Sequence, residues 1–256
     1  MSTQNGKPRV AFFDFTSCEG CQLTVLDALQ THPELLDVVD IVEFREASSA
    51  RSDDYDIAFI EGSCTRPGDE ARLQTIRETA ATVVALGACA HLGGINAIRN
   101  TQPLDDVRAY VYGDKAGWYD TYAPRAIDRV IDVDVAIPGC PIDRDEFVRT
   151  VSMLLQGRQP VIPDYPMCIE CKLRENDCVY MQDKICLGPV TRAGCNAICP
   201  AYGYGCEGCR GLISQPNMEA FQTVLAEHGL KLADIESKFS IFLTNQTLAG
   251  EETANG

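Results

Sequence analysis

Val10-Ala11-Phe12-Phe13-Asp14-Phe15, followed at once by Thr16-Ser17-Cys18-Glu19-Gly20-Cys21, is the stretch of sequence that decides the fold. A short, continuous apolar run is typical of a central strand in a parallel sheet, because such a strand is covered on both faces. Leu23, Leu26 and Leu29 then recur at helical spacing, which predicts a helix over residues 22–30. The two cysteines therefore lie in the loop of a strand–loop–helix unit, where α/β sheets present their ligands.

The next part of the chain repeats this alternation. Strand patterns occupy residues 38–44, 56–60, 82–86 and 133–137, and helical patterns occupy residues 69–81 and 143–156. In the last of these, Phe147, Val151 and Leu154 or Leu155 share one face. Alternating strands and helices over the first ~155 residues predict an α/β fold with a flavodoxin-like, doubly wound parallel sheet.

Single cysteines follow three of the other strands. Cys89 and Cys140 come after the fourth and fifth strands, each in a turn of small residues. The carboxyl ends of parallel strands meet at one edge, so we expect Cys18, Cys21, Cys89 and Cys140 to converge on a metal. Cys64 follows the third strand, and we expect it to be a small buried residue rather than an extra ligand.

The composition changes from residue 159, where Pro160, Pro163 and Pro166 interrupt the chain. We therefore predict a flavodoxin-like domain over residues 1–158 and an irregular iron–sulfur domain over residues 159–256. The second domain has few apolar residues around its cysteines, so bound metal is expected to contribute much of its folding free energy. One helix is predicted at residues 218–228, followed by a polar tail. The eight cysteines of this domain are Cys168, Cys171, Cys178, Cys186, Cys195, Cys199, Cys206 and Cys209.

The spacing of these eight cysteines favours iron–sulfur clusters over zinc. A zinc ribbon would use two Cys-x-x-Cys pairs, Cys168 with Cys171 and Cys206 with Cys209, and would leave the four cysteines between them unexplained. Two four-iron clusters account for all eight. The spacing alone does not decide which four cysteines belong together, because such motifs exchange ligands between clusters.

The charge balance narrows the kinds of partner. The chain has 22 Lys and Arg against 37 Asp and Glu, a net charge of −15. Such an acidic chain lacks the basic footprint that nucleic acid or an anionic membrane requires.

The chain has thirteen cysteines, an odd number, and residues 1–9 do not form an apolar leader. No apolar membrane span is predicted either. These features favour reduced, metal-bound thiols in the cytoplasm over disulfides. No Gly-rich phosphate loop occurs, so we assign no flavin or nucleotide to the chain.

Several other side chains admit more than one interpretation. Glu61 is either a proton relay beside the first cysteines, or it caps a helix or pairs with an arginine. The same alternatives apply to Glu19, with less support for the relay. Four positive charges flank the cysteine motifs, and they could offset thiolate charge or form a docking patch. The default expectation is that they are solvated surface charges. They are Lys172, Lys184, Arg192 and Arg210. A cluster of aromatics is expected to be local core rather than partner surface; it comprises Tyr110, Tyr112, Trp118, Tyr119 and Tyr122.

The order of the motifs resembles the small, electron-transferring subunit of nickel–iron hydrogenases. That order is Cys-x-x-Cys after the first strand, Glu-Gly-Ser at the third, Gly-x-Cys at the fourth and Pro-Gly-Cys-Pro at the fifth, and then the cysteine-rich part. Gly188-Pro189-Val190-Thr191-Arg192-Ala193-Gly194-Cys195 and Cys206-Glu207-Gly208-Cys209-Arg210-Gly211 are similar to the cytoplasmic branch, which includes sulfhydrogenase delta subunits. The resemblance covers residues 10–211.

The resemblance implies three 4Fe-4S clusters. It assigns Cys18, Cys21, Cys89 and Cys140 to a proximal cluster beside the nickel–iron centre of a partner large subunit. It assigns a medial cluster to Cys195, Cys199, Cys206 and Cys209, and a distal cluster to Cys168, Cys171, Cys178 and Cys186. Periplasmic members commonly have a histidine where this chain has Cys168, and a proline that leaves a three-iron medial cluster where it has Cys199. Three four-iron clusters are therefore expected.

The resemblance also implies a function. The chain would relay electrons between the nickel–iron site of the large subunit and a soluble acceptor such as NAD(P) or ferredoxin. Its further partners would be flavin- and NAD(P)-binding or iron–sulfur electron-acceptor subunits. Two alternatives are a quinone-linked respiratory iron–sulfur subunit and a zinc-stabilised interaction module without redox activity. The first typically has two adjacent cysteines after its first strand and lacks the cysteine-rich second part, and both features differ here.

Overall fold

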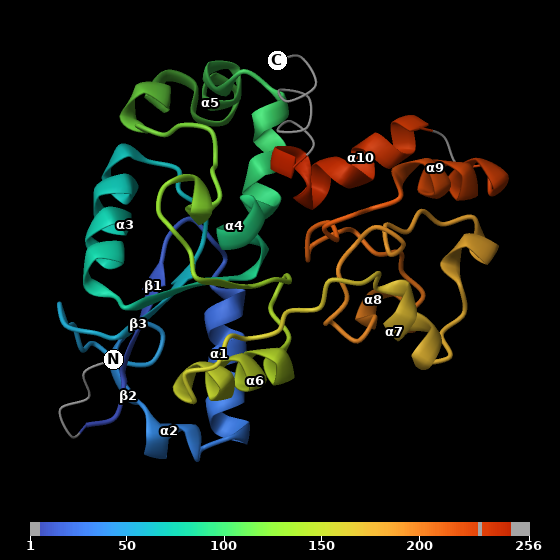
Figure 1. Cartoon of the computed structure of the whole chain (residues 1–256). Helices are drawn as coiled ribbons and strands as arrows, with labels where there is room; N and C mark the ends of the chain where they lie inside the picture. The colour runs from blue at the N-terminus through green and yellow to red at the C-terminus, as the bar shows by residue number, and fades with distance from the viewer. Residues whose placement is uncertain (1–5, 230–231, 247–256) are drawn as a thin grey trace. The chain divides into compact units, whose positions relative to one another are not determined.

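The structure, a computed structural model, describes residues 6–229 and 232–246. It divides the chain into two compact units, residues 1–161 and residues 162–256. Figure 1 shows the first unit in blue to yellow-green and the second in yellow to red.

The first unit is built on one parallel sheet of five strands in the order β2-β1-β3-β4-β5. This order confirms the predicted flavodoxin-like, doubly wound sheet. Asp14, Glu61 and Leu86 occupy matching positions at the carboxyl ends of the three central strands. The strands are β1 (Arg9–Asp14), β2 (Asp40–Phe44), β3 (Ile57–Glu61), β4 (Thr82–Leu86) and β5 (Val135–Ile137).

Helices cover both faces of this sheet. α1 and α6 pack on one face through Val25 and Phe147, and α3 packs on the other through Leu73. Asp143 caps α6 by accepting the backbone N–H of Glu146 at 2.8 Å. The helices are α1 (Gly20–Thr31), α2 (Leu35–Val38), α3 (Pro67–Thr79), α4 (Gly87–Leu92), α5 (Leu104–Tyr112) and α6 (Arg144–Leu155), with 3-10 turns η1 (Gly94–Thr101), η2 (Gly113–Trp118) and η3 (Ile127–Arg129).

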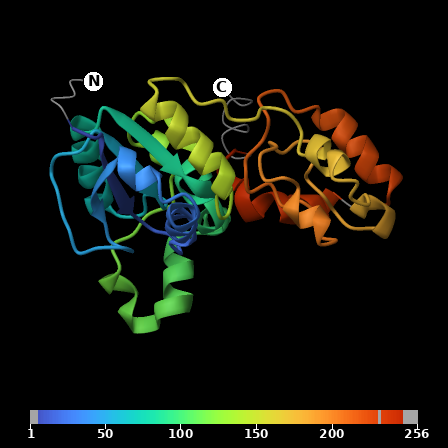
Figure 2. The same ribbon diagram turned by 90° about the horizontal axis from the view of Figure 1, so that it is seen from below.

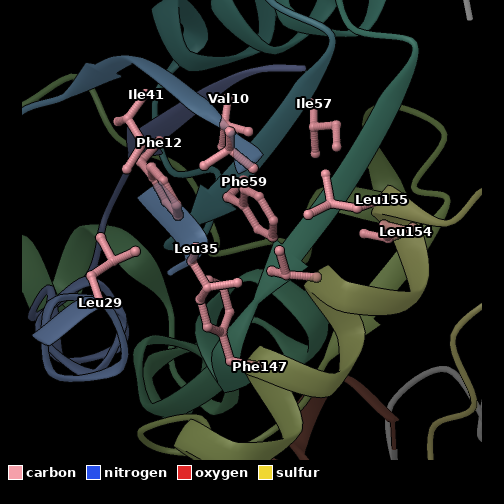
Figure 3. A pocket seen from close by; sticks show the side chains of 12 residues that line it. Val10, Phe12, Leu29, Leu35, Ile41, Ile57, Phe59, Phe147, Leu154 and Leu155 are labelled. Atoms are coloured by element: carbon pink, nitrogen blue, oxygen red, sulfur yellow. The ribbon is translucent and has the colours of Figure 1, made fainter. Parts of the chain in front are cut away.

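The core between the sheet and α6 is closely packed (Figure 3). Phe12 stacks on Phe59 with ring centroids 4.9 Å apart, and Phe59 packs against Phe147 at 5.6 Å. The side chains around these rings leave a cavity of about 20 Å³, which has room for about one water molecule. This space is therefore core rather than a ligand pocket.

α1 confirms the helix predicted over residues 22–30, but its leucines do not all face the sheet. Leu23 is 54% exposed, whereas Cys21, Gln22, Val25 and Ala28 are buried. Apolar residues are spread around this helix, so their spacing alone did not identify the face that packs on the sheet. Leu26 and Leu29 are partly buried and pack against the core, so of the three leucines only Leu23 is exposed.

The expectation that the aromatics after residue 109 form a local core is wrong for most of them. Tyr110 is 92% exposed and Trp118 is 75% exposed, and Tyr112 and Tyr119 are also exposed. α5 has no buried residue, and in Figure 2 the green segment that contains α5 and η2 extends away from the sheet. Tyr122 differs, since its hydroxyl donates to the backbone oxygen of Arg66 at 2.9 Å. Only this last aromatic is built into the unit.

The second unit is irregular around its cysteines. Its described elements are α7 (Cys168–Leu173), α8 (Ile198–Ala201), α9 (Met218–Glu227) and α10 (Leu232–Phe242), with the 3-10 turn η4 (Val179–Gln182). α9 matches the predicted helix, but α10 lies where a polar tail was expected. Ile235, Phe239 and Phe242 are buried, at the spacing of one helix face. Residues 247–256 of the expected tail lie outside the described residues.

In residues 6–229 and 232–246, no helix is both long enough and apolar enough to cross a lipid bilayer.

Candidate metal centres

Four thiols gather at the carboxyl end of the first unit's sheet. Cys18 and Cys21 lie at the start of α1, directly after β1, while Cys89 lies in α4, after β4, and Cys140 follows β5. Burial raises the pKa of Cys89 to about 12, and the nearby thiols of Cys140 and Cys18 raise it further. Burial also raises the pKa of Cys140, again with a contribution from Cys18. The structure therefore brings together side chains that are more than 120 residues apart in sequence.

The absence of a side chain at Gly87 makes this convergence possible. Gly87, between β4 and Cys89, has a φ of +77°, and a Cβ at this position would collide with the Sγ of Cys21. The backbone N–H of Ala88 donates to the oxygen of Gly139 at 2.7 Å, which joins the loops after β4 and β5. A side chain at residue 87 would occupy the space that the thiols share.

Glu61 is the acid that the structure places against this group. Its side chain is buried, and its two carboxylate oxygens accept the backbone N–H groups of Cys21 at 3.1 Å and Gln22 at 2.9 Å. Burial raises the pKa of Glu61, and these two hydrogen bonds oppose the rise. Glu61 therefore caps the first turn of α1, one of the roles expected from sequence. Its role as a proton relay stays a prediction.

Two polar side chains near the first group were not singled out from the sequence. Asn96 donates to the backbone oxygen of Thr16 at 2.8 Å and to Ser63 Oγ at 2.9 Å, so it ties the loops after β1 and β3 to η1. Gln22 is 1% exposed. The sequence signal for Asn96 is its position in the Gly-Gly-Ile-Asn turn shortly after Cys89. Gln22 carries no such signal.

The described contacts of Cys64 are with Tyr122 and Arg125 rather than with the four thiols. It is fully buried, and its Sγ lies 3.0 Å from the hydroxyl of Tyr122. Burial raises its pKa, and the hydrogen bond to Tyr122 opposes the rise. Its backbone N–H donates to the oxygen of Arg125 at 3.0 Å. These contacts agree with the expected small buried residue.

In the second unit, one group of thiols forms around α7. Burial raises the pKa of Cys168 to about 12, with further contributions from Cys186, Cys171 and Cys178. A Cβ on Gly188 would lie 3.3 Å from the Sγ atoms of both Cys168 and Cys186. The backbone N–H of Cys206 donates to Cys186 Sγ at 3.2 Å. The four cysteines that the resemblance assigns to a distal cluster thus lie near one another, and Cys186 also lies next to Cys206.

The remaining thiols lie in two sequence pairs. Burial raises the pKa of Cys199, and the neighbouring thiol of Cys195 and the carboxylate of Glu207 raise it further. Burial raises the pKa of Cys206, with contributions from Cys186 and Cys209. Glu207 lies between Cys206 and Cys209 in sequence, so Cys199 is near that loop. Cys199 is exposed, and the other seven cysteines of this unit are not.

The default expectation for Arg210 is wrong, because the side chain is not solvated. Arg210 is 1% exposed, and its Nε donates to the backbone oxygen of Ala193 at 2.6 Å. Arg192 is partly exposed and pairs with Asp164 at 2.6 Å. Lys172 and Lys184 are exposed, as expected. Among these four charges, Arg210 alone lies in the interior of the second unit.

The donor chemistry of these groups fits iron–sulfur clusters. Such clusters are held by four cysteine thiolates, and backbone N–H groups directed at sulfur stabilise them. All thirteen cysteines are free thiols. Within the described residues, no three His, Cys, Asp or Glu side chains converge closely enough to hold a single metal ion. The grouping therefore rests on which thiols lie near one another rather than on a closed ligand shell.

Comparison with protein families adds a direct observation. Residues 18–154 match the profile of a family described as NADH ubiquinone oxidoreductase, 20 Kd subunit. The chain belongs to this oxidoreductase subunit family. The match spans more than half of the chain and contains Cys18, Cys21, Cys89 and Cys140. It ends before the cysteine-rich unit.

Within the family, the full-length relatives carry hydrogenase names. The chain is 36% identical to sulfhydrogenase 2 subunit delta of Pyrococcus furiosus, over 86% of this chain and 92% of the relative. It is 28% identical to a subunit of the F420-non-reducing hydrogenase vhu of Methanococcus voltae, over 92% of this chain and 95% of the relative. These alignments confirm the resemblance found from the cysteine motifs.

Solved structures agree with this placement. A chain of an NAD+-reducing [NiFe]-hydrogenase in the H2-reduced state is 26% identical, with a TM-score of 0.54, and the match covers 62% of this chain and 96% of that one. A chain of the actinobacterial-type NiFe-hydrogenase from Ralstonia eutropha H16 is 15% identical, with a TM-score of 0.58, and the match covers 97% of this chain and 90% of that one. The second likeness concerns the fold alone. This family member thus has the sheet of hydrogenase subunits.

Proposed function

We propose that the chain is the electron-transfer small subunit of a nickel–iron hydrogenase and holds three 4Fe-4S clusters. When bound, these clusters would carry single electrons between the nickel–iron centre of a partner large subunit and a soluble acceptor such as NAD(P) or ferredoxin. The observation that carries the proposal is the convergence of four thiols from three strand ends, in a chain whose full-length relatives are hydrogenase subunits.

The chain's own residues would have three tasks in this function. The first group would bind the proximal cluster through Cys18, Cys21, Cys89 and Cys140, with Glu61 fixing the turn between the first two ligands. The second unit would bind the distal cluster through Cys168, Cys171, Cys178 and Cys186, and the medial cluster through Cys195, Cys199, Cys206 and Cys209. The protein around them would exclude water and set their potentials.

The exposure of the first group supports a partner on that side of the first unit. Cys18 and Cys140 are exposed, whereas Cys21 is buried. Electron transfer to another subunit requires a cluster near the surface, and a partner would then cover these two thiols. A large subunit with the nickel–iron centre fits this place, with NAD(P)-binding or iron–sulfur acceptor subunits as further partners. A cytoplasmic location stays a prediction.

The experiment is hydrogen-driven reduction of the complete complex. The chain, co-purified anaerobically with its companion subunits, should be brown and should bleach when hydrogen is added, as its clusters are reduced. Reoxidation by NAD(P) or by ferredoxin, compared side by side, would identify the acceptor. A complex that contains iron and nickel but whose visible absorption does not respond to hydrogen would refute the proposal.

A second candidate follows from the description of the matched family, which names a ubiquinone oxidoreductase. A quinone-linked respiratory subunit would share the first unit. The family match, however, stops at residue 154, and eight cysteines lie beyond it. Reduction of a quinone by the purified complex with NADH, and not hydrogen, as the electron donor would favour this candidate.

A further inference from the structure

An aromatic arm projects from the first unit. The arm, residues 104–121, comprises α5, η2 and the residues that follow η2, and in Figure 2 it extends away from the sheet. Tyr110 and Trp118 are its most exposed aromatic side chains, and no residue of α5 or η2 is buried. Clustered large aromatics on a protein surface are typical of interaction sites. The arm therefore has the composition of a docking surface.

Contacts within the arm hold its rings in place without burying them. The rings of Tyr112, at the end of α5, and Tyr119, directly after η2, stack with their centroids 3.9 Å apart. Near the base of the arm, Arg108 Nε donates to Thr121 Oγ1 at 3.3 Å. Side chains that are already ordered lose little conformational entropy when a partner binds. The arm is thus preorganised for association.

Both ends of the arm are tied to the loop that carries Cys18. Before the arm, Asn96 donates to the backbone oxygen of Thr16 at 2.8 Å. After the arm, the backbone N–H of Tyr122 donates to the oxygen of Thr65 at 2.9 Å, and Thr65 Oγ1 lies 2.6 Å from Thr16 Oγ1. Thr16 is two residues before Cys18, which is exposed. The arm therefore rises from the edge of the sheet that carries the first thiol group.

The turn η1 links that thiol group to the arm. A Cβ on Gly94, the first residue of η1, would lie 2.8 Å from Cys89 Sγ, so the turn lies directly against this thiol. The same turn carries Ile95 and Ile98, whose side chains are both exposed. A surface that covers the first thiol group is thus next to two exposed isoleucines and to the base of the arm.

The charges of the arm indicate the chemistry of its partner. Residues 104–121 contain four aspartates and two basic residues. Lys115 lies 5.3 Å from the ring centroid of Trp118, so one of the two cations is directed at the arm's own aromatic ring. The surplus of acids disfavours an anionic lipid surface. It fits a protein surface with apolar sites for the rings and basic side chains at their rim. The aspartates are Asp105, Asp106, Asp114 and Asp120.

We propose that the aromatic arm is a docking element for the nickel-bearing large subunit, which would cover the arm and the exposed thiols of the first group with one continuous surface. The inference rests on the proposed function, because that function places the large subunit over Cys18 and Cys140. In the same function, electrons leave for the acceptor from the clusters of the second unit. An acceptor subunit would therefore dock on the second unit, and the large subunit is the partner that fits the arm.

The test is the accessibility of the arm in the assembled protein. Carbene footprinting measures the labelling of Tyr110 and Trp118 in the full chain alone, in its complex with the large subunit, and in the complete complex. Both side chains should be labelled in the chain alone and should lose most of this labelling once the large subunit is bound. Protection already in the chain alone, or only after acceptor subunits are added, would overturn the inference.

Variants give a second, independent measurement. Trp118→Ala should speed dissociation of the chain from the large subunit about 30-fold, measured by exchange against an excess of tagged wild-type chain, with its iron content unchanged. Tyr202→Ala, in the second unit, is the matched control, because Tyr202 is 76% exposed and Trp118 is 75% exposed. It should leave this dissociation unchanged.

The outcomes separate this inference from the proposed function. If Trp118→Ala and Tyr110→Ala dissociate from the large subunit as slowly as the wild type, the inference is wrong, while the proposed function stands. Loss of binding to anionic lipid vesicles in Trp118→Ala, with unchanged binding to the large subunit, would likewise overturn it in favour of a membrane contact. A wild-type chain that binds no nickel-bearing subunit would overturn the proposed function itself.

Discussion

The Glu61 carboxylate, at the end of β3, accepts the backbone N–H of Cys21 in the first turn of α1, with 3.1 Å between Oε1 and the nitrogen. This contact joins the central strand of the sheet to the loop that presents the first pair of thiols. A buried carboxylate thus positions a cysteine by holding its backbone rather than its side chain. It also offers negative charge to the positive end of the helix.

Replacement of this carboxylate should cost stability and disturb the first thiol group. Glu61→Gln keeps one oxygen, but its NH2 group would face a backbone N–H, so we expect a loss of about 1–3 kcal/mol in the free energy of unfolding. Denaturant unfolding, with iron content measured in parallel, checks this. Glu78→Gln, on an exposed part of α3, is the control and should change little.

The same variant separates the cap from a proton relay. If Glu61→Gln retains its iron and full hydrogen–deuterium exchange activity, an essential relay at this position is ruled out. If exchange is lost while iron and cluster reduction are intact, the relay is supported, because a glutamine does not take up and release a proton.

Gly87→Ala should remove the first cluster and leave the others. The new Cβ would collide with Cys21 Sγ and would sit on a backbone with a φ of +77°, so we expect a loss of about four irons per chain. Gly157→Ala is the matched control, since its φ is +68° and nothing lies within 4 Å of the new Cβ. It has the backbone strain, about 1–2 kcal/mol, without the collision. Full iron in Gly87→Ala would contradict the assignment of this space to a cluster.

Cys64, the one cysteine outside the three quartets, should not be required for iron binding. Cys64→Ala removes a buried thiol whose partner is the hydroxyl of Tyr122 at 3.0 Å. We expect all of the iron to be retained, with a loss of about 1 kcal/mol in stability from the broken hydrogen bond. Cys89→Ala, in the first group, should instead lose that cluster. Equal iron loss in both variants would mean that Cys64 is a ligand.

The exposed aromatics of the segment containing α5 and η2 should contribute little to the stability of this chain. Trp118 is 75% exposed, so Trp118→Ala is expected to change the free energy of unfolding by less than about 0.5 kcal/mol. Phe59→Ala, at 2% exposed, should cost about 3–5 kcal/mol. A large loss in Trp118→Ala, measured on the chain without companions, would show that the segment packs against its own unit.

The sequence predicts the sheet well because its strands are buried on both faces. The run from Thr82 to Leu86 predicts a buried strand, and β4 has these bounds. The sequence predicts less where burial is decided by three-dimensional neighbours. Leu23 has the apolar character of a core residue but faces outward, because Gln22 and Val25 take the sheet side of α1.

The cysteine motifs show the same division. Their position at strand ends follows from parallel topology, so the convergence of Cys18, Cys21, Cys89 and Cys140 was predictable. The burial of Arg210 was not, since its neighbours come from segments that no periodicity joins. Spacing alone also leaves the partition of the second unit's eight thiols open.

The most direct test of the central claim is the iron and sulfide content of the chain in its anaerobically purified complex, after the iron and sulfide of the companion subunits are measured separately and subtracted. Three four-iron clusters require about twelve irons and about twelve sulfides per chain, together with nickel in a companion subunit. That is the result we expect. A colourless chain that contains zinc in place of iron would contradict the account.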